Sequence, residues 1–362
     1  MAEHEPRPDV SGENPTALVL GVGGNVSQGI QKALSMGTLR PRVVAACVSS
    51  RSAGLYVADR SYVSPYADDP DFFEWLVEVC EREAVDVVLS GVEPVLSVLA
   101  ERVAELWDRA GAVALVSDPD TLDIGGDKLR TARWLADNGL NSARTADAAD
   151  PEAVTALAAE TGLPLIAKPR SGRGAHGVMV LAAEPDLDWA RGRDGYMVQE
   201  LLGNPDSEYT VGCFSDREGR VRGTIAMRRR LEEGTTVTAE AGAFPEVTAE
   251  ASRIATALRP AGPCNVQLRI HDGRPVCFEI NVRFSGTTPI RARLGFNEVE
   301  EGIRHYALGV EARDLPTVDN GVVVRYWNEL HVDERAMHAL EAGRLDDPHA
   351  YPPLVEDFEP PR

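Results

Sequence analysis

The chain has 362 residues, a length that suits two or three packed domains, and its hydrophobic content of 43% is ample for a large core. Its 57 acidic and 37 basic residues give a formal net charge of −20. Because such a surface repels phosphate groups, we expect neither nucleic acid nor an anionic membrane as a partner. The sequence also lacks any run of 18 apolar residues, so we expect no membrane-spanning helix.

The first stretch, residues 1–15, reads MAEHEPRPDVSGENP and is acidic and rich in proline. It lacks the basic start and apolar run of a signal peptide, so we expect a disordered leader. Five cysteines occur without any CxxC pair, which is typical of buried free thiols in a reducing cytosol. We therefore expect a cytoplasmic protein.

Strands and helices alternate over residues 16–117, which predicts right-handed crossovers and a doubly wound parallel α/β domain. The stretch 16–34, TALVLGVGGNVSQGIQKAL, contains a strand, a glycine-rich turn and an amphipathic helix. The later segments are a strand at 42–50, a helix at 70–85, a strand, turn and helix at 86–111, and a strand at 112–117.

The turn GVGGNVSQG lies between a strand and a helix, an arrangement that favours anion binding at the helix N-terminus. Its spacing is not GxGxxG, and no acid ends the second strand to hold a ribose. Gly23 and Asn25 are therefore candidates for a weak anion or substrate site, and a plain tight turn is the alternative. Glu93 follows the strand VVLSG, at the sheet edge where ligands bind in such folds. An ordinary acid at a helix N-terminus is an equal alternative for Glu93.

Only three of the 37 basic residues are lysines, so the placement of Lys128 and Lys168 is informative. Lys128 follows Asp127 near the start of a helix within 118–140, and Lys168 ends an apolar strand. The glycines after Lys168 would let backbone N–H groups approach phosphate oxygens. Because strands flank this turn on both sides, we predict a flexible flap over a nucleotide, with a plain hairpin tip as the alternative. The loop residues concerned are Ser171, Gly172, Gly174, His176 and Gly177.

The next strand, YMVQELL, ends in residues that could offer backbone groups to an adenine edge: Glu200, Leu201 and Leu202. Glu208, shortly after it, could accept ribose hydroxyls. Each acid taken alone is more often a plain surface residue.

A basic run, Arg228, Arg229 and Arg230, stands out in an acidic chain. It lies in 221–230, which we predict to be a strand paired with 207–216. A strand points alternate residues to opposite faces, so we expect one or two of the three arginines to contact a phosphate or a substrate carboxylate.

The stretch CNVQLRIHDGRPVCFEINVRF predicts two strands joined by a turn. Glu279, Asn281 and Arg283 alternate with apolar residues, which puts the three polar groups on one face. A two-residue loop would pair Gln267 with Phe278, which would put polar and apolar residues opposite each other on the same face. A loop of three or five residues pairs Gln267 with Glu279. We predict the second register, because it keeps the polar groups together. The resulting oxygen donors suit Mg²⁺, and Arg283 could bind a phosphate or carboxylate, although a solvated sheet face with a salt bridge is the alternative.

The order of these features resembles the ATP-grasp superfamily, and most closely its carbamoyl-phosphate-synthase large-subunit-like and biotin-carboxylase-like branch. The motifs that carry the resemblance are DK at 127–128, KP and the glycine-rich loop at 168–177, QELL at 199–202, and EINVRFSGT at 279–287.

The resemblance implies an N-terminal (pre-ATP-grasp) α/β domain over 16–117 and a two-lobed α+β ATP-grasp domain over 118–310. A glycine-rich lid subdomain is expected at about 143–200. Residues 311–362 are expected to pack on the ATP-grasp core.

The resemblance also implies that ATP and Mg²⁺ bind between two lobes, with Mn²⁺ as an alternative ion. Lys128 and Lys168 would contact the phosphates beneath the 171–177 loop, the backbone at 200–202 would contact adenine, and Glu208 would contact the ribose. Gln267, Glu279 and Asn281 would hold the metal, and Arg283 and Arg229 would act on the transferred phosphoryl group. The remaining substrate candidates are Gly23, Asn25, Glu93, Arg228, Ser285, Gly286, Thr287, Arg291 and Arg293. For Arg291 and Arg293, the alternative is that they are charged residues on the surface of a helix.

The chemistry implied is phosphorylation of a small-molecule or amino-acid carboxylate to an acyl phosphate. An amine then displaces phosphate and forms an amide or peptide-like bond. The chain shows no second synthase half, glutaminase or MKM-type biotin signal, so a stand-alone biosynthetic carboxylate–amine ligase is expected. The family is often dimeric, which leaves a homodimer open. The alternatives are a dinucleotide-dependent oxidoreductase built on 16–117 and a non-catalytic nucleotide-binding protein.

Overall fold

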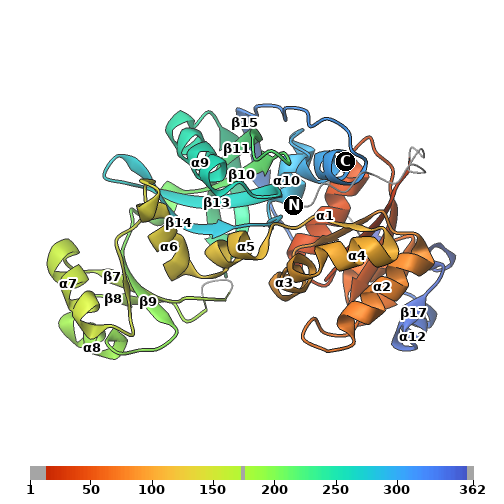
Figure 1. Ribbon diagram of the computed structural model, residues 1–362, viewed down its shortest axis with the longest axis horizontal. Helices are drawn as coiled ribbons and strands as arrows, with labels where there is room; N and C mark the ends of the chain where they lie inside the picture. The colour runs from red at the N-terminus through yellow and green to blue at the C-terminus, as the bar shows by residue number, and fades with distance from the viewer. Residues whose placement is uncertain (1–13, 173–175, 357–362) are drawn as a thin grey trace.

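The computed structural model describes residues 14–172 and 176–356, so most of the expected leader, and Gly174, lie outside the described residues. Figure 1 shows an N-terminal domain at one end of the molecule, a large sheet in the centre and a small lobe at the other end. Among the helices described, none is long and apolar enough to cross a bilayer.

The N-terminal domain is a doubly wound fold, as predicted: five parallel strands lie between helices, in the order β3-β2-β1-β4-β5. The turn after β1 contains Gly21 at φ +75°, where a Cβ atom would lie 2.2 Å from Cγ2 of Val92, so only glycine fits. The elements are β1 (Thr16–Leu20), α1 (Asn25–Met36), β2 (Arg42–Cys47), the 3₁₀ turn Ala53–Val57, β3 (Arg60–Val63), α2 (Phe72–Glu83), β4 (Val87–Ser90), α3 (Glu93–Glu101), α4 (Val103–Ala110) and β5 (Val113–Ala114).

The C-terminal segment divides between two parts of the molecule, whereas 311–362 was expected to pack on the ATP-grasp core. The strand β15 (Asn320–Val324) joins the large sheet, but α12 (Glu334–Glu341) and β17 (Arg344–Leu345) return to the N-terminal domain. There β17 pairs antiparallel with the edge strand β3, and Ala336 and Leu340 of α12 are fully buried. Covering an open sheet edge and burying an apolar helix stripe explain this return. Figure 1 shows these late elements beside the early ones. The remaining C-terminal elements are β16 (Glu329–His331), the 3₁₀ turn Pro348–Ala350 and β18 (Leu354–Glu356).

The small lobe is a four-stranded antiparallel sheet with its own apolar core, in the order β6-β9-β7-β8. Two helices, α5 (Pro119–Gly126) and α6 (Lys128–Asp137), lead into it from the N-terminal domain. Asp127 caps α6 and also accepts hydrogen bonds from the guanidinium of Arg170, which ties the helix to the end of β7. The elements of the lobe are β6 (Thr145–Asp147), α7 (Pro151–Thr161), β7 (Leu165–Pro169), β8 (Met179–Leu181), α8 (Glu184–Ala190) and β9 (Tyr196–Glu200).

The large sheet has six strands in the order β14-β13-β10-β11-β12-β15. Helix α9 packs on one face, where Val211, Val266 and Ile280 belong to a single apolar cluster. The opposite face shares a core with α1 of the N-terminal domain, so the two parts are packed together. The elements are the 3₁₀ turn Pro205–Ser207, β10 (Glu208–Ser215), β11 (Val221–Glu232), β12 (Thr235–Gly242), α9 (Pro245–Leu258), β13 (Gly262–His271), β14 (Arg274–Asn281), α10 (Thr288–Arg293), α11 (Glu298–Gly302) and the π-helical turn Ile303–Ala307.

The hairpin of β13 and β14 has the predicted register, with Gln267 opposite Glu279, but reaches it in a different way. The loop is the two-residue turn Asp272-Gly273, with both residues at positive φ, as a type I′ turn requires. One extra residue, Phe278, bulges out of β14 and shifts the pairing by one position. The bulge restores the polar face that a two-residue turn alone would have split.

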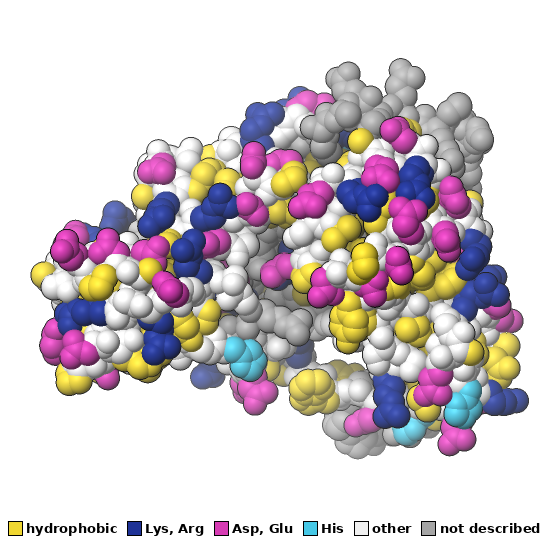
Figure 2. All heavy atoms as spheres, turned by 60° about the horizontal axis from the view of Figure 1, so that its bottom comes forward, with side chains coloured by type: hydrophobic (Ala, Val, Ile, Leu, Met, Phe, Trp, Pro, Cys, Tyr) yellow, Lys and Arg dark blue, Asp and Glu magenta, His cyan; other side chains and the backbone are white. Residues whose placement is uncertain are grey.

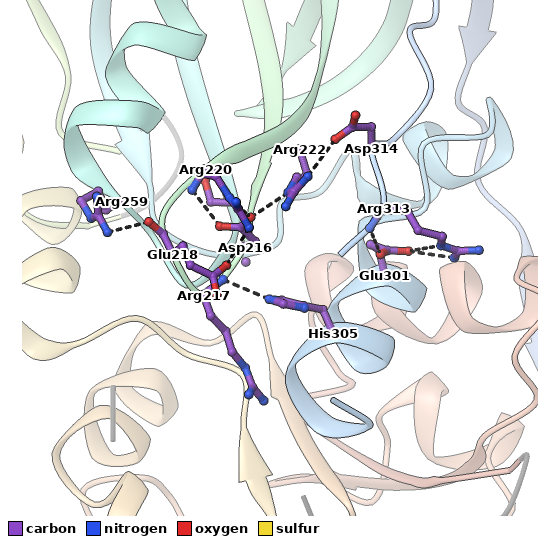
Figure 3. A network of polar contacts seen from close by, with 12 residues as sticks. Asp216, Arg217, Glu218, Arg220, Arg222, Arg259, Glu301, His305, Arg313 and Asp314 are labelled. Carbon is purple, nitrogen blue, oxygen red and sulfur yellow. Dashed lines mark hydrogen bonds and ion pairs between the residues drawn. The ribbon is translucent and has the colours of Figure 1, made fainter. Parts of the chain in front are cut away.

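A polar network surrounds the turn between β10 and β11, at one end of the large sheet (Figure 3). Asp216 accepts hydrogen bonds from Nε of Arg220 at 2.8 Å and Nε of Arg222 at 2.7 Å. Burial alone would raise the pKa of Asp216, but these hydrogen bonds outweigh it and lower the pKa to about 2. Nearby, Arg313 pairs with Glu301, so Arg220, Arg222 and Arg313 have carboxylate partners from the chain itself. The guanidinium groups of Arg217 and Arg259 donate instead to the carbonyl oxygens of Tyr306 and Glu218.

Candidate active site

Two adjoining cavities form one cleft at the other end of β10 and β11. The larger, of about 650 Å³, borders the N-terminal domain, and the smaller, of about 370 Å³, borders the small lobe. We call them the N-terminal cavity and the lobe cavity. Figure 2 shows the surface hollowed between the small lobe and the N-terminal domain. Both cavities are lined by Arg229, Glu233, Gly234, Gln267 and Glu279.

The three predicted metal ligands lie together on the polar face of the hairpin. Oε1 of Glu279 accepts hydrogen bonds at 3.0 Å from Nε2 of Gln267 and at 3.0 Å from Nδ2 of Asn281. The possible metal ligands are one carboxylate and two side-chain amides, and each can present a hard oxygen atom to the N-terminal cavity. This set fits Mg²⁺, which takes one or two carboxylates and completes its octahedron with phosphate and water oxygens. The alternating pattern around β14 thus places the donors where such an ion would need them.

Lys168 lies in the lobe cavity at the end of β7. Its Nζ donates to Oε1 of Gln199 at 2.9 Å and lies 5.1 Å from the ring centroid of Phe278. Burial lowers the pKa of Lys168 to about 8, and the nearby carboxylate of Glu279 counters this only in part. A half-buried ammonium whose hydrogen-bond partner among the described residues is a neutral amide is well suited to receive an anion.

Lys128 also lines the lobe cavity, and its Nζ donates to the carbonyl oxygen of Gly172 at 3.1 Å. The lysine thus reaches the glycine-rich loop, of which Gly172 and His176 line the N-terminal cavity. Ser171 and Gly177 are exposed but do not line either cavity.

The predicted adenine-contacting residues line the lobe cavity together with apolar side chains that can cover a flat base. Oε1 of Glu200 accepts a hydrogen bond from the backbone N–H of Arg144 at 2.8 Å, which fixes the end of β9. The lining residues on this side include Ile166, Val178, Glu200, Leu201, Leu202, Leu231 and Phe278.

Glu208 lies in the same cavity but has two cationic partners already. Its Oε1 accepts from Nη2 of Arg229 at 2.8 Å, and its Oε2 accepts from Nη2 of Arg269 at 2.7 Å. The side chain is 5% exposed. Contact with a ribose therefore requires Glu208 to share oxygen lone pairs with these arginines, and this contact stays a prediction.

Of the three consecutive arginines, only Arg229 reaches the cleft. It is buried, and its Nη2 also donates to Oε1 of Gln267 at 2.6 Å. Arg228 and Arg230 are exposed, and Arg228 pairs with Glu240 of the neighbouring strand at 2.5 Å. Strand alternation explains this division, and the expectation that Arg228 contacts substrate is corrected.

The N-terminal domain contributes Glu93 and Asn25 to the N-terminal cavity. Oε1 of Glu93 lies 2.9 Å from Nη2 of Arg283, so an acid of α3 holds the last polar residue of the hairpin. Gly23 does not line either cavity, and its backbone N–H donates to Sγ of Cys47 at 3.3 Å.

Ser285, Gly286 and Thr287 line the N-terminal cavity, but the two arginines that follow do not. Arg291 is completely buried, pairs with Glu298 and donates to Oδ1 of Asn265 at 3.0 Å. Arg291 thus holds Asn265, which lines the N-terminal cavity. Arg293 is exposed on α10. Both are therefore corrected as contacts for a substrate carboxylate.

Four functional residues of the cleft were not identified from the sequence. Gln199 and Phe278 contact Lys168, Arg269 holds Glu208, and Arg325 lines the N-terminal cavity. Two of them left a signal: Gln199 stands in the motif QELL, and Arg325 is a lone arginine at the end of the apolar run GVVVR.

Family models match two segments of the chain. Residues 193–330 match the family described as ATP-grasp in the biosynthetic pathway with Ter operon, and residues 18–110 match the PylC-like N-terminal domain. The chain therefore has an ATP-grasp domain behind a PylC-like N-terminal domain, and the resemblance found in the sequence is confirmed.

Similar proteins include the carbamoyl phosphate synthase arginine-specific large chain of Bacillus subtilis, 26% identical over 290 residues, or 75% of this chain and 27% of that protein. The carbamoyl phosphate synthase large chain of Rubrobacter xylanophilus is 24% identical over 334 residues, or 84% of this chain and 30% of that protein. The chain thus spans less than a third of the length of these curated relatives.

Solved structures share the fold at low identity. An ADP complex of an N5-carboxyaminoimidazole ribonucleotide synthetase has a TM-score of 0.69 and 18% identity, covering 86% of this chain and 82% of the other. The biotin carboxylase domain of Hydrogenobacter thermophilus 2-oxoglutarate carboxylase, with MgADP and bicarbonate, has a TM-score of 0.66 and 18% identity, covering 85% and 73%. The predicted fold class is confirmed.

Proposed function

We propose that the protein is an ATP-dependent carboxylate–amine ligase. The γ-phosphoryl group of ATP passes to an oxygen of a small-molecule carboxylate, which gives an acyl phosphate and ADP. An amine nitrogen then attacks the carbonyl carbon, the C–N bond forms, the C–O bond to phosphate breaks, and the amine loses a proton. Phosphate leaves, and an amide remains.

One observation carries this proposal: Lys168, Glu279 and Asn281, taken from two lobes, line adjoining cavities in a single cleft. Phosphoryl transfer needs positioning and charge neutralisation rather than a protein nucleophile. Lys168 supplies a half-buried ammonium on one side of the cleft, and the hairpin supplies oxygen ligands on the other. Such an arrangement suits a triphosphate held between them.

The residues divide into roles along the cleft. Lys128, Lys168 and the 171–177 loop bind the phosphates, and the backbone at 200–202 binds adenine. Gln267, Glu279 and Asn281 would hold Mg²⁺, with Mn²⁺ as the alternative, and the ion would neutralise phosphate charge. Arg283 and Arg229 steady the transferred group, and Ser285, Gly286 and Thr287 border the second substrate.

We also propose the domain limits 16–117 and 118–310, with a lid at about 143–200, and a cytoplasmic location. The separate core of the small lobe supports a lid that moves as a unit. The five cysteines, all buried and free, support a reducing compartment.

The test is release of ADP from ATP with Mg²⁺ and a panel of organic acids and amino acids, with Glu279→Gln as the blank. We expect turnover that requires Mg²⁺ and a carboxylate and falls at least about 100-fold in Glu279→Gln, because the one carboxylate of the metal set is lost. Normal turnover by Glu279→Gln would refute the metal role. Binding of NADH with no binding of ATP would favour an oxidoreductase instead.

A further inference from the structure

The turn between β11 and β12 brings a glutamate to the junction of the two cavities. Its two central residues are Glu233 and Gly234, and Glu232 before them pairs with Thr235 after them. Glu233 has φ +48° and Gly234 has φ +75°, as a type I′ turn requires. Turns of this type favour glycine, asparagine or aspartate at such positions. The backbone of the turn therefore gives no reason for a glutamate here.

Five carboxylates line the two cavities, and within the described part of the chain only that of Glu233 has no hydrogen-bond or ion-pair partner. The other four accept hydrogen bonds or pair with arginines, and these are Glu93, Glu200, Glu208 and Glu279. Glu233 is also exposed, so a proton that it accepts can pass on to water. Its carboxylate is therefore free to act as a proton acceptor in the cleft.

Glu233 shares the junction of the cavities with two of the metal ligands. The residues that line both cavities are Arg229, Glu233, Gly234, Gln267 and Glu279. Under the proposed function, Gln267 and Glu279 hold the ion at the phosphates, and the second substrate lies next to them in the N-terminal cavity. A carboxylate beside phosphates is unfavourable unless a positive charge also comes there. The nitrogen of an attacking amine brings such a charge.

We propose that Glu233 is the general base of the step in which the amine displaces phosphate. The inference rests on the proposed function and names the residue that takes the proton from the amine. The neutral amine nitrogen attacks the carbonyl carbon of the acyl phosphate and becomes positively charged as the C–N bond forms. Glu233 accepts a proton from that nitrogen, the C–O bond to phosphate breaks, and phosphate leaves with the bonding electrons. Glu233 then gives the proton to water.

The experiment separates formation of the acyl phosphate from its reaction with an amine. Acyl phosphates react with concentrated hydroxylamine without a catalyst, so the hydroxamate formed with ATP, Mg²⁺ and a panel of organic acids measures the first step. The amide formed with ammonia, methylamine, putrescine and the standard amino acids measures both steps. For Glu233→Gln we expect hydroxamate formation within about twofold of the parent protein and amide formation at least about 100-fold lower, because only the second step needs the base.

Three further variants test whether the effect belongs to this carboxylate. Glu233→Asp keeps a carboxylate and suits the turn, so amide formation should stay within about tenfold of the parent protein. Glu232→Gln is the matched control, because the neighbouring Glu232 is exposed and lines neither cavity, and it should change neither step. His176→Gln removes the alternative proton acceptor of the N-terminal cavity and should leave the ratio of amide to hydroxamate unchanged.

The outcomes distinguish failure of this inference from failure of the proposed function. If the parent protein forms no hydroxamate with any acid, the ligase proposal fails. If Glu233→Gln lowers hydroxamate and amide equally, Glu233 acts on ATP or the metal, and its assignment as the base is overturned. The assignment is also overturned if the parent protein forms hydroxamate but no amide, or if His176→Gln lowers the ratio and Glu233→Gln does not.

Discussion

The two ends of strands β10 and β11 use cationic residues in opposite ways. At the turn, Arg220 and Arg222 converge on Asp216, which is buried and fully engaged. In the cleft, the described hydrogen-bond acceptors of Lys168 and Arg325 are amide and carbonyl oxygens. A cation neutralised by its own chain stabilises the fold, whereas one left with neutral partners keeps its charge for a ligand. The difference concerns Lys168 and Arg325 in particular, because Arg229 and Arg283 line the same cleft while paired with Glu208 and Glu93.

Replacing Lys168 with methionine should have the largest effect. We expect ATP turnover to fall at least about 100-fold, since a preorganised charge at the phosphates is lost while the stem of the side chain still fills its place. Release of ADP measures the effect, and Lys32→Met, which removes an exposed lysine of α1, is the control. An equal loss of ATP turnover in both variants would contradict a specific role for Lys168.

The free energy of unfolding should fall by different amounts when a charged residue is removed at the two ends. Asp216→Asn should lower the free energy of unfolding by about 1–3 kcal/mol, because two guanidinium groups lose their counter-charge. Arg325→Ala should lower it by less than about 1 kcal/mol, since only hydrogen bonds to neutral carbonyls are lost. Urea denaturation of both variants measures the contrast, and a larger loss in Arg325→Ala would contradict it.

The dependence of stability on pH in acid solution tests the same comparison. Because the pKa of Asp216 is lowered from 3.8 to about 2 in the folded protein, its contribution to stability is present above pH 3.8 and is lost as pH falls toward 2. Asp216→Asn should flatten the loss of stability over this interval.

Nucleotide affinity should fall in alkaline solution. With the pKa of Lys168 lowered to about 8, the empty cleft loses its ammonium as pH rises above that value, and anionic phosphates bind the protonated form. The affinity for ADP should then fall by up to about tenfold per pH unit. Titration calorimetry between pH 7 and 10 checks this, and the slope should vanish in Lys168→Met.

The smallest effect is expected at Phe278. Its ring lies against Lys168 and Arg269 and lines the lobe cavity. Phe278→Ala removes a cation–π contact worth about 0.5–1 kcal/mol at a half-buried site, so affinity for ADP should fall about two- to fivefold. Because the bulge is a backbone feature, β14 should keep its register, which the circular dichroism spectrum and an unchanged Mg²⁺ requirement would report.

The sequence predicts the hairpin register because only one pairing puts Gln267 on the same face as Glu279 and Asn281. It does not reveal whether the extra residue lies in the turn or in the strand, so the bulge at Phe278 was missed. The sequence likewise predicts that neighbouring arginines of 228–230 point to opposite faces of the strand. Which of them faces the cleft depends on the register with β10, which the sequence does not give.

Contacts between distant segments escape such reasoning. Arg291 looked like a surface or substrate-binding residue, because its buried partner Glu298 comes from a different helix. Arg325 was overlooked, since its neighbours Thr236, Gly286 and Asn25 become adjacent only when β15 joins the sheet and the two domains pack.

The position of Arg325 on the last strand to join the large sheet has a consequence for biosynthesis of the protein. Every residue assigned to the nucleotide precedes it in the chain, so during translation the ATP half of the cleft is synthesised first. A nascent chain halted before β15 would carry the groups assigned to the phosphates, together with Asn25 and Glu93, yet would lack Arg325. The lining of the N-terminal cavity is therefore completed late on the ribosome, with the last strand that joins the large sheet.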